Sequence, residues 1–282
     1  MNNKILVITG MHRSGTSLIT QWLHKCGLPI GDRLLGALVG NAEGHFEDLD
    51  FVEFHSQVLE SQGLAGNGLD NKAVHEIDEA ATQQLTNLIG HKNEEHAAWG
   101  WKDPRTCLFL SIYHKLLPGA RYLIIVRDHG AVVNSLISRI YRSAEKKYLN
   151  RSPFSAWLWK TFRKDLRKRK LYRTLTEKYL QVYIAYNEEI LHHAQQLPAD
   201  QYRVVDYKVL TKSDEPVFAH LKNSWNFPLH YIPFNDVYKE NLLNTPVSLL
   251  PFVRDKSLLV KAMELEMRLR KLIPMEEQEK TG

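Results

Sequence analysis

The sequence predicts an α/β fold, with three α/β/α layers around a mainly parallel central sheet. The prediction depends first on Lys4–Thr9, a short apolar run rich in β-branched residues, which is typical of a strand buried on both faces. It depends second on the next eighteen residues of the chain. Gly10–Gly15 is a glycine-containing loop, and from Thr16 apolar residues recur at helical spacing until Gly27. Strand, loop and helix in this order open a βαβ unit.

Later segments continue the alternation. We expect further strands at Arg121–Val126 and Tyr202–Tyr207, and Trp99–Trp101 has the composition of a buried strand end. Helical patterns lie at about 49–62, 73–90, 106–117, 130–142, 214–222 and 257–273, with one or two long helices in 155–197. No Gly/Ser-rich linker interrupts the chain. We therefore expect one domain over residues 1–274 and a flexible tail over 275–282.

Composition excludes several classes of protein. Hydrophobic residues make up 44% of the 282 residues and charged residues 24%, as in ordinary globular proteins. The longest apolar runs, such as Leu123–Val126, are too short to span a bilayer, and no secretion signal precedes the first strand. Cys26 and Cys107 both lie in helical patterns, so we expect no disulfide and a cytoplasmic protein.

The charge is unevenly distributed. The chain has a formal net charge of +5. Between Arg139 and Arg173, 13 lysines and arginines accompany only Glu145 and Asp165, a net charge of +11 that leaves −6 for the remainder. This segment either contacts an anionic partner, such as a nucleotide, an acidic glycan, a nucleic acid or membrane headgroups, or forms a solvated helix face. Charge alone leaves both readings open.

Residues 10–17 read Gly-Met-His-Arg-Ser-Gly-Thr-Ser, close to the nucleotide-binding pattern G-x-x-x-x-G-K-[ST]. Glycines let the backbone approach a phosphate, and the helix that begins near Thr16 directs its first N–H groups and positive dipole end at it. Thr16 stands where nucleotide triphosphatases need a lysine, so Arg13 is the only full positive charge in the loop. The alternative is a strand-to-helix turn without a ligand. The order of strand, loop, hydroxyl pair and helix favours an anion site with a P-loop-like turn.

A second pair of residues lies further along the chain, where Arg127 closes a strand and Ser135 follows on the next helix. Together with the loop Arg13–Ser17, this pair resembles the family of sulfotransferases that use 3′-phosphoadenosine 5′-phosphosulfate (PAPS). In that family, such a loop binds the 5′-phosphosulfate, and the arginine–serine pair holds the 3′-phosphate. The resemblance implies PAPS as co-substrate, bound by Arg13, Ser14, Gly15, Thr16, Ser17, Arg127 and Ser135. The alternative readings are a salt bridge from Arg127 to Asp128 or Asp103, and a Ser135 hydroxyl bonded to its own helix.

Two further motifs match this family, and all four follow one another along the chain in the same order as in its members. Trp101–Arg105 is similar to the Lys-Asp-Pro segment of several members, and Gly44–Asp48 is similar to the Gly-aromatic-Glu segment in which bacterial relatives keep the catalytic base. The C-terminal half matches less well. Tyr207–Leu210 resembles a degraded form of the family's Tyr-Glu-Asp-Leu strand end. The sequence lacks the Arg-Lys-Gly loop with which cytosolic members also hold the 3′-phosphate, and Lys239 is the candidate to replace it.

The resemblance implies catalytic roles for Glu47, Lys102 and Arg13, with Glu47 as the general base. The substitutes for this base are Glu43, Asp48 and His45. Without the resemblance, the sequence favours Glu47 and Asp48 as carboxylates that face the N-terminal dipole of the helix that follows them. Lys102 would then be a surface lysine before a proline turn.

The chemistry requires no metal. A departing sulfuryl group is close to neutral SO₃, so negative charge grows mainly on the phosphate of the nucleotide. Loop N–H groups, Arg13 and Lys102 are suited to stabilise that charge. His192 and His193 are adjacent rather than at ligand spacing, and no metal site is expected.

Three functions compete at this point. The first is transfer of a sulfuryl group to a hydroxyl acceptor, expected to be a carbohydrate or a glycolipid. The second is a P-loop nucleotide kinase or hydrolase, which shares the loop but requires the missing lysine. The third is a non-catalytic anion-binding module whose basic residues 139–173 dock on nucleic acid or an anionic membrane. For the first function we expect no specific nucleic acid as partner. The resemblance favours the first.

Overall fold

The central sheet has four strands, and every described pair is parallel. In the computed structural model, which describes residues 3–36, 44–238 and 247–274, the strands are β1 (Lys4–Thr9), β2 (Ala98–Lys102), β3 (Arg121–Val126) and β4 (Tyr202–Asp206). Their order is β2-β1-β3-β4. From β1 the chain therefore continues to β2 on one side, and from β2 it crosses over to β3 on the other side of β1. Carboxyl ends beside such a reversal are where open parallel sheets bind ligands.

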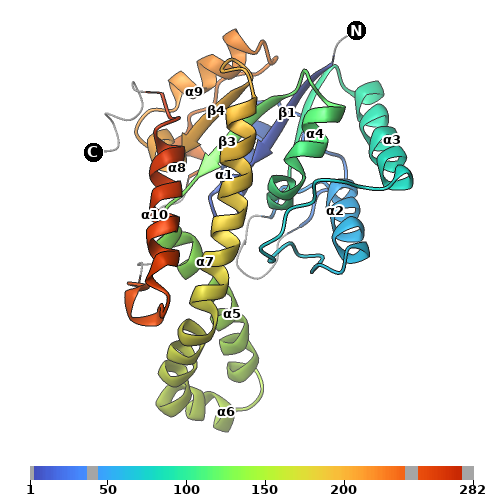
Figure 1. Ribbon diagram of the computed structural model, residues 1–282. Coiled ribbons are helices and arrows are strands. Elements are labelled where there is room, and N and C mark those ends of the chain that lie inside the picture. Colours follow the sequence, from blue (N-terminus) through green and yellow to red (C-terminus); the bar gives the residue numbers. More distant parts are fainter. Residues whose placement is uncertain (1–2, 37–43, 239–246, 275–282) are drawn as a thin grey trace.

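Helices cover both faces of the sheet, which confirms the predicted α/β fold class (Figure 1). Side chains alternate along a strand, so Leu6 and Ile8 face one apolar cluster and Ile5 and Val7 face the other. The first cluster is covered by α1 (Thr16–Lys25), α9 (Glu215–Ala219) and the π-helical turn His220–Ser224. The second is covered by α2 (Leu49–Ser61), α3 (Glu79–Glu95), α4 (Leu110–Leu116), α5 (His129–Leu149), α7 (Lys164–Gln196) and α10 (Lys256–Arg270).

Shorter elements complete the fold. They are α6 (Pro153–Leu158), the π-helical turn Trp159–Arg163, α8 (Tyr207–Leu210) and the 3₁₀ turns Pro104–Phe109, Phe234–Asp236 and Leu250–Phe252. Figure 1 shows the end of α5, α6 and the start of α7 projecting as a hairpin beyond the sheet. Across the described residues, no helix is both long enough and apolar enough to cross a bilayer. Cys26 and Cys107 form no disulfide, as predicted, and both are buried.

Differences from the predicted boundaries have local causes. The helix expected over 73–90 begins at Glu79, because the Asp78 carboxylate caps it by accepting from the N–H of Ala81, 2.7 Å away. The helix expected over 106–117 begins as the 3₁₀ turn Pro104–Phe109, which Asp103 caps. The strand expected to reach Tyr207 ends at Asp206, because α8 begins at Tyr207. The single domain over 1–274 stays a prediction, and residues 275–282 lie outside the described part.

Replacing Phe51 with alanine should lower the free energy of unfolding by about 3–5 kcal/mol, because a fully buried ring would leave a cavity. The Phe51 ring stacks on Trp101 with centroids 4.5 Å apart and an interplanar angle of 2°. Urea denaturation followed by circular dichroism measures the change. The matched control is Phe154→Ala on α6, whose ring is exposed and should cost less than about 0.5 kcal/mol. Equal losses for the two variants would contradict this packing.

Candidate functional site

The loop between β1 and α1 has the backbone of a phosphate cradle. A Cβ atom on Gly10 would lie 2.5 Å from the carbonyl oxygen of Ile125, so this close approach to β3 requires glycine. Gly15, at φ 100°, is the N-cap of α1, and Arg13 has φ 70°, a left-handed conformation that is uncommon outside glycine. The backbone thus turns twice within six residues at the end of β1.

The N-terminus of α1 is left open for an anion. Its first turn carries no acidic residue, and no described side chain caps it. The first N–H groups of a helix have no partner within the helix, and the dipole adds partial positive charge there. Thr16 and Ser17 add two hydroxyl groups in the same turn. This end of the helix is suited to a phosphate or sulfate group.

The structure brings Arg13, Arg127 and Ser135 together beside the loop. The Arg127 Nη1 donates to the carbonyl oxygen of Arg13 at 2.8 Å, and the Arg13 Nε donates to the Ser135 Oγ at 2.9 Å. Residues 122 positions apart in the chain therefore meet at the carboxyl edge of the sheet. Asp128, considered as a salt-bridge partner of Arg127, instead caps α5 by accepting from the N–H of Ala131.

Two arginines outside the four family motifs lie close enough to act on this site. The pKa of Arg13 is lowered to about 10, first by burial and then by the positive charges of Arg139, Arg127 and Arg142. In the sequence, Arg139 and Arg142 stand out only as members of the basic segment. The sequence offered one indication that Arg139 belongs to the site: it lies one helical turn after Ser135 on α5. The site gathers like charges, as a site for a multiply charged anion does.

Lys102 lies on the other side of the loop and is fully buried at the end of β2. Its Nζ donates to the Glu47 Oε1 at 2.7 Å and to the Ser17 Oγ at 3.0 Å. Burial lowers the pKa of Lys102 and raises that of Glu47, while their mutual attraction opposes both shifts. The reading of Lys102 as a surface lysine was wrong. Glu47 pairs with Lys102 rather than capping α2.

The substitutes for Glu47 differ in their contacts. Asp48 caps α2 by accepting from the N–H of Asp50, and it lies 3.1 Å from the Lys92 Nζ, so its position is structural. The His45 Nδ1 lies 3.9 Å from the Glu47 Oε1, and burial, with nearby cations, lowers the pKa of His45 to about 4. Glu43 and the suggested Lys239 lie outside the described residues.

A buried polar network holds the segment after Lys102. The Asp103 carboxylate accepts from Arg105 at 2.6 Å and lies 2.9 Å from the His55 Nδ1, whose ring also reaches the Tyr113 hydroxyl at 2.8 Å. Burial opposes ionisation of Asp103, but Arg105 and His55 outweigh it and hold its pKa well below the usual range. In the loop itself, burial lowers the pKa of His12 to about 3, so its imidazole is neutral. This network fixes the end of β2, and no sequence motif indicated the part played by His55.

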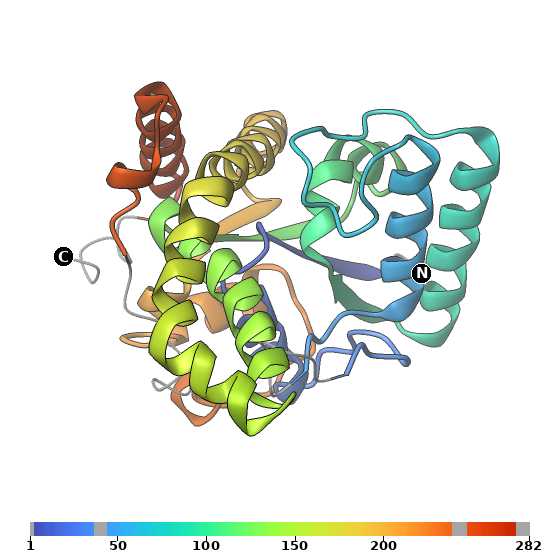
Figure 2. The ribbon, with the colours of Figure 1, turned by 90° about the horizontal axis from the view of Figure 1, so that it is seen from below.

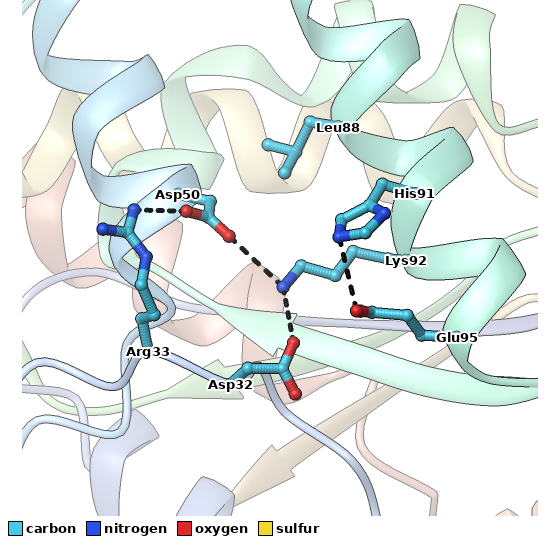
Figure 3. A pocket seen from close by; sticks show the side chains of 7 residues that line it. All are labelled: Asp32, Arg33, Asp50, Leu88, His91, Lys92 and Glu95. Atoms are coloured by element: carbon cyan, nitrogen blue, oxygen red, sulfur yellow. Dashed lines mark hydrogen bonds and ion pairs between the residues drawn. The ribbon is translucent and has the colours of Figure 1, made fainter.

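A second cluster, beside α2 and α3, is shown in Figure 3. The Lys92 Nζ lies 3.0 Å from Asp32, 3.1 Å from Asp48 and 3.2 Å from Asp50. Burial alone would lower the pKa of Lys92, but these carboxylates raise it overall. Within the described part of the chain, Asp32, Glu95 and His96 have the spacing of metal ligands. The Lys92 ammonium already neutralises Asp32, which disfavours a cation there.

Because Asp48 follows Glu47 directly, the Lys92 cluster fixes the start of α2 and with it the segment that carries Glu47. The pocket of about 450 Å³ beside it is lined by Asp32, Arg33, Asp50, Leu88, His91, Lys92 and Glu95. In Figure 3 the charged groups that line it point toward one another. We assign this cluster a supporting role.

Comparison with known proteins gives three findings. A family model described as "Sulfotransferase family" matches residues 6–229. Two curated proteins, each described as a "Putative protein-tyrosine sulfotransferase", match over 63 residues: that of Caenorhabditis elegans is 33% identical and that of Caenorhabditis briggsae 32%. These matches cover 22% of this chain and 24% and 22% of the relatives, so the chain spans about a quarter of their length.

Among solved structures, a sulfotransferase from Mycobacterium avium aligns with a TM-score of 0.56 at 14% identity, over 94% of this chain and 76% of the other. This likeness concerns the fold alone.

The Lys92 cluster generates a stability prediction. Lys92→Met should lower the free energy of unfolding by about 3 kcal/mol, because it leaves the buried Asp48 carboxylate without its partner. Chemical denaturation measures the loss. The matched control is Lys115→Met on α4, whose side chain is exposed and should be close to neutral. Unchanged stability of Lys92→Met would show that the carboxylates do not depend on this ammonium.

Proposed function

The chain belongs to the sulfotransferase family, and from this premise we propose that it transfers a sulfuryl group from PAPS to a hydroxyl acceptor. One observation carries the proposal. Arg13, Arg127 and Ser135 meet at 2.8 and 2.9 Å beside an uncapped helix N-terminus whose first turn has no acidic residue. A donor with phosphate groups at both ends of its ribose fits such a concentration of donors and positive charge.

The residues divide into two groups around the loop. Loop N–H groups, Ser14, Gly15, Thr16 and Ser17 would hold the 5′-phosphosulfate, and Arg127 with Ser135 would recognise the 3′-phosphate. Arg13 lies in the loop of the first group and contacts both members of the second, Arg127 through its carbonyl oxygen and Ser135 through its side chain. The nearby Arg139 and Arg142 add positive charge that favours a doubly anionic ligand.

Bound PAPS supplies the sulfuryl group and a phosphate leaving group. The chain supplies stabilisation of charge on that phosphate through loop N–H groups, Arg13 and Lys102. Lys102 reaches the loop directly at Ser17, 3.0 Å away. Because the group transferred is close to neutral, these fixed charges suffice without a divalent cation.

Glu47 is the proposed general base. Its carboxylate lies in the same hydrogen-bonded unit as Lys102, and burial raises its pKa above the usual glutamate value. A carboxylate with a raised pKa is a stronger base for an acceptor hydroxyl than an exposed one. Lys102 holds the carboxylate in place and adds positive charge beside the loop.

We propose a carbohydrate or glycoconjugate hydroxyl as the acceptor. A tyrosine hydroxyl is the second candidate, because the Caenorhabditis relatives are described as putative protein-tyrosine sulfotransferases. Labelled PAPS offered with sugar, glycolipid and tyrosine-peptide acceptors separates the two candidates. Labelling of the peptide alone would decide for the second.

The donor proposal predicts a nucleotide preference. Adenosine 3′,5′-bisphosphate should bind more tightly than adenosine 5′-phosphate or ATP in calorimetry. Ser135→Ala should weaken bisphosphate binding roughly ten- to a hundredfold, since a hydrogen bond to a charged group is lost, and should leave adenosine 5′-phosphate almost unaffected. The control is Ser143→Ala, exposed on the same helix. Tighter binding of ATP with Mg²⁺ would instead favour the kinase or hydrolase reading.

The base proposal predicts that Glu47→Gln lowers turnover about 10²- to 10⁴-fold, because the acceptor proton loses its base. Nucleotide affinity should be retained, since glutamine still accepts a hydrogen bond from Lys102. The wild-type rate should survive removal of divalent metal by a chelator. Glu53→Gln, an exposed residue on α2, is the matched control and should keep full turnover. Full activity of Glu47→Gln would reassign the base.

The rate should also respond to pH with a defined sign. Glu47 acts only when ionised, so turnover should rise as pH passes its raised pKa. Lys102 stabilises negative charge only when protonated, so turnover should fall as pH passes its lowered pKa. A profile for Glu47→Gln that keeps the acidic limb would show that another group causes it.

A further inference from the structure

The hairpin that projects from the body ends in a tip, defined as residues 149–170. It comprises the end of α5, α6, the π-helical turn and the first turns of α7. Every residue from Lys160 to Lys170 is exposed, so the helix there presents all its sides to solvent. Figure 1 shows this segment standing away from the sheet, and in Figure 2, seen from below, it points toward the viewer. The residues implied in nucleotide binding and catalysis all lie outside it.

Large apolar side chains gather on the tip instead of being buried. Phe154 is 70% exposed, Trp157 55% and Phe162 57%, and their rings contact one another in sequence, with centroids 6.0 and 5.8 Å apart. Leu166, 71% exposed, lies one helical turn beyond Phe162. These four residues form an apolar ridge. A contiguous exposed ridge of this kind marks a contact surface.

The tip is nevertheless a built structure. The Trp159 ring is buried and stacks on Tyr148 with centroids 4.7 Å apart, and its Nε1 donates to the Glu145 Oε1 at 3.2 Å. Arg163 lies over the Tyr148 ring at 5.8 Å. Trp159 thus anchors the π-helical turn to α5, and the neighbouring rings of the ridge are held outward by this packing.

Positive charge surrounds the ridge. The tip carries Arg151, Lys160, Arg163, Lys164, Arg167, Lys168, Arg169 and Lys170. Its one carboxylate is Asp165, which leaves a net charge of +7. A second copy of the chain is a poor occupant of this surface, because the same charge on both copies would repel.

We propose that the tip docks on the surface of an anionic phospholipid bilayer. Aromatic and leucine side chains favour the boundary between headgroups and acyl chains, and flanking lysines and arginines favour anionic headgroups. The ridge supplies the aromatic and leucine side chains, and the eight cations supply the positive charge. The proposal goes beyond the donor chemistry and does not depend on it, because docking needs neither PAPS nor turnover.

Docking would also orient the site. α5 carries Ser135 and Arg139 in its first turns and Leu149 at the tip, so one helix joins the two regions. An enzyme held this way would present the carboxyl edge of the sheet at a fixed distance from the lipid surface.

The charge contribution is tested by sedimentation of the full chain with vesicles. Binding to phosphatidylcholine mixed with phosphatidylglycerol should exceed binding to phosphatidylcholine alone and should fall with added salt. The triple variant Lys164→Gln/Arg167→Gln/Lys168→Gln should bind the mixed vesicles about a hundredfold more weakly. Neutralising exposed lysines elsewhere should change little. A matched control is the triple variant Lys25→Gln/Lys72→Gln/Lys115→Gln.

The apolar contribution is tested with Phe154→Ser/Trp157→Ser/Phe162→Ser. This variant should lose at least about tenfold in affinity for the mixed vesicles, with its unfolding free energy almost unchanged because the rings are exposed. Trp157 fluorescence in the wild type, read against Trp157→Phe, should shift to shorter wavelength on binding.

Three results would overturn the proposal. The first is equal binding of the chain to neutral and anionic vesicles. The second is tighter binding of single-stranded DNA than of anionic vesicles, with the DNA displacing them. The third is a wild-type dimer in light scattering that the serine variant converts to a monomer while vesicle binding is unaffected. A failed nucleotide titration would affect the donor proposal only.

Discussion

The buried ammonium of Lys102 is the constraint on which the candidate site depends. A charge removed from water is tolerated only with close partners, and Lys102 has them in Glu47 at 2.7 Å and Ser17 at 3.0 Å. Through these contacts the end of β2, the first turn of α1 and the segment before α2 are joined at one point. The same contacts place a carboxylate with a raised pKa next to a loop suited to an anion, so this ion pair lies where the proposed chemistry requires it.

The charged groups of the molecule have three different arrangements. Around Arg13, like charges gather at the edge of the sheet and, together with burial, lower the pKa of Arg13. Around Lys92, three carboxylates compensate one ammonium and hold α2 in place. On the tip, cations surround exposed rings. The first arrangement combines excess positive charge with an uncapped helix whose first turn has no acidic residue, as the proposed nucleotide donor requires, and this separates it from the pocket of Figure 3.

Local patterns predicted the strands and the loop well. β1 and β3 are short apolar runs, and glycines at positions 10 and 15 are typical of a tight loop with positive φ angles. The pairing of Arg127 with Ser135 was expected only through the family resemblance, and the contact of Arg13 with Ser135 was not predicted. The partner of Lys102 could not be predicted at all, since Glu47 lies 55 positions away and only folding joins them. Arg139 and Arg142 were hidden in a basic run, where spacing from Ser135 was the sole hint. The start of α3 was misjudged because a cap at Asp78 outweighed apolar periodicity.

The 33 residues of α7 run without interruption from the tip to the core, where the Tyr183 hydroxyl donates to the carbonyl oxygen of Arg127 at 3.0 Å. At 1.5 Å per residue the helix is a strut of about 50 Å, and each residue turns it by about 100°. Because Trp159 also anchors the tip to α5, inserting or deleting a single residue midway would turn the tip end of α7 out of register with α5 while the core end stayed in place. Length changes in this helix should therefore be tolerated mainly in steps of about seven residues, two full turns, a restriction that ordinary surface helices do not carry.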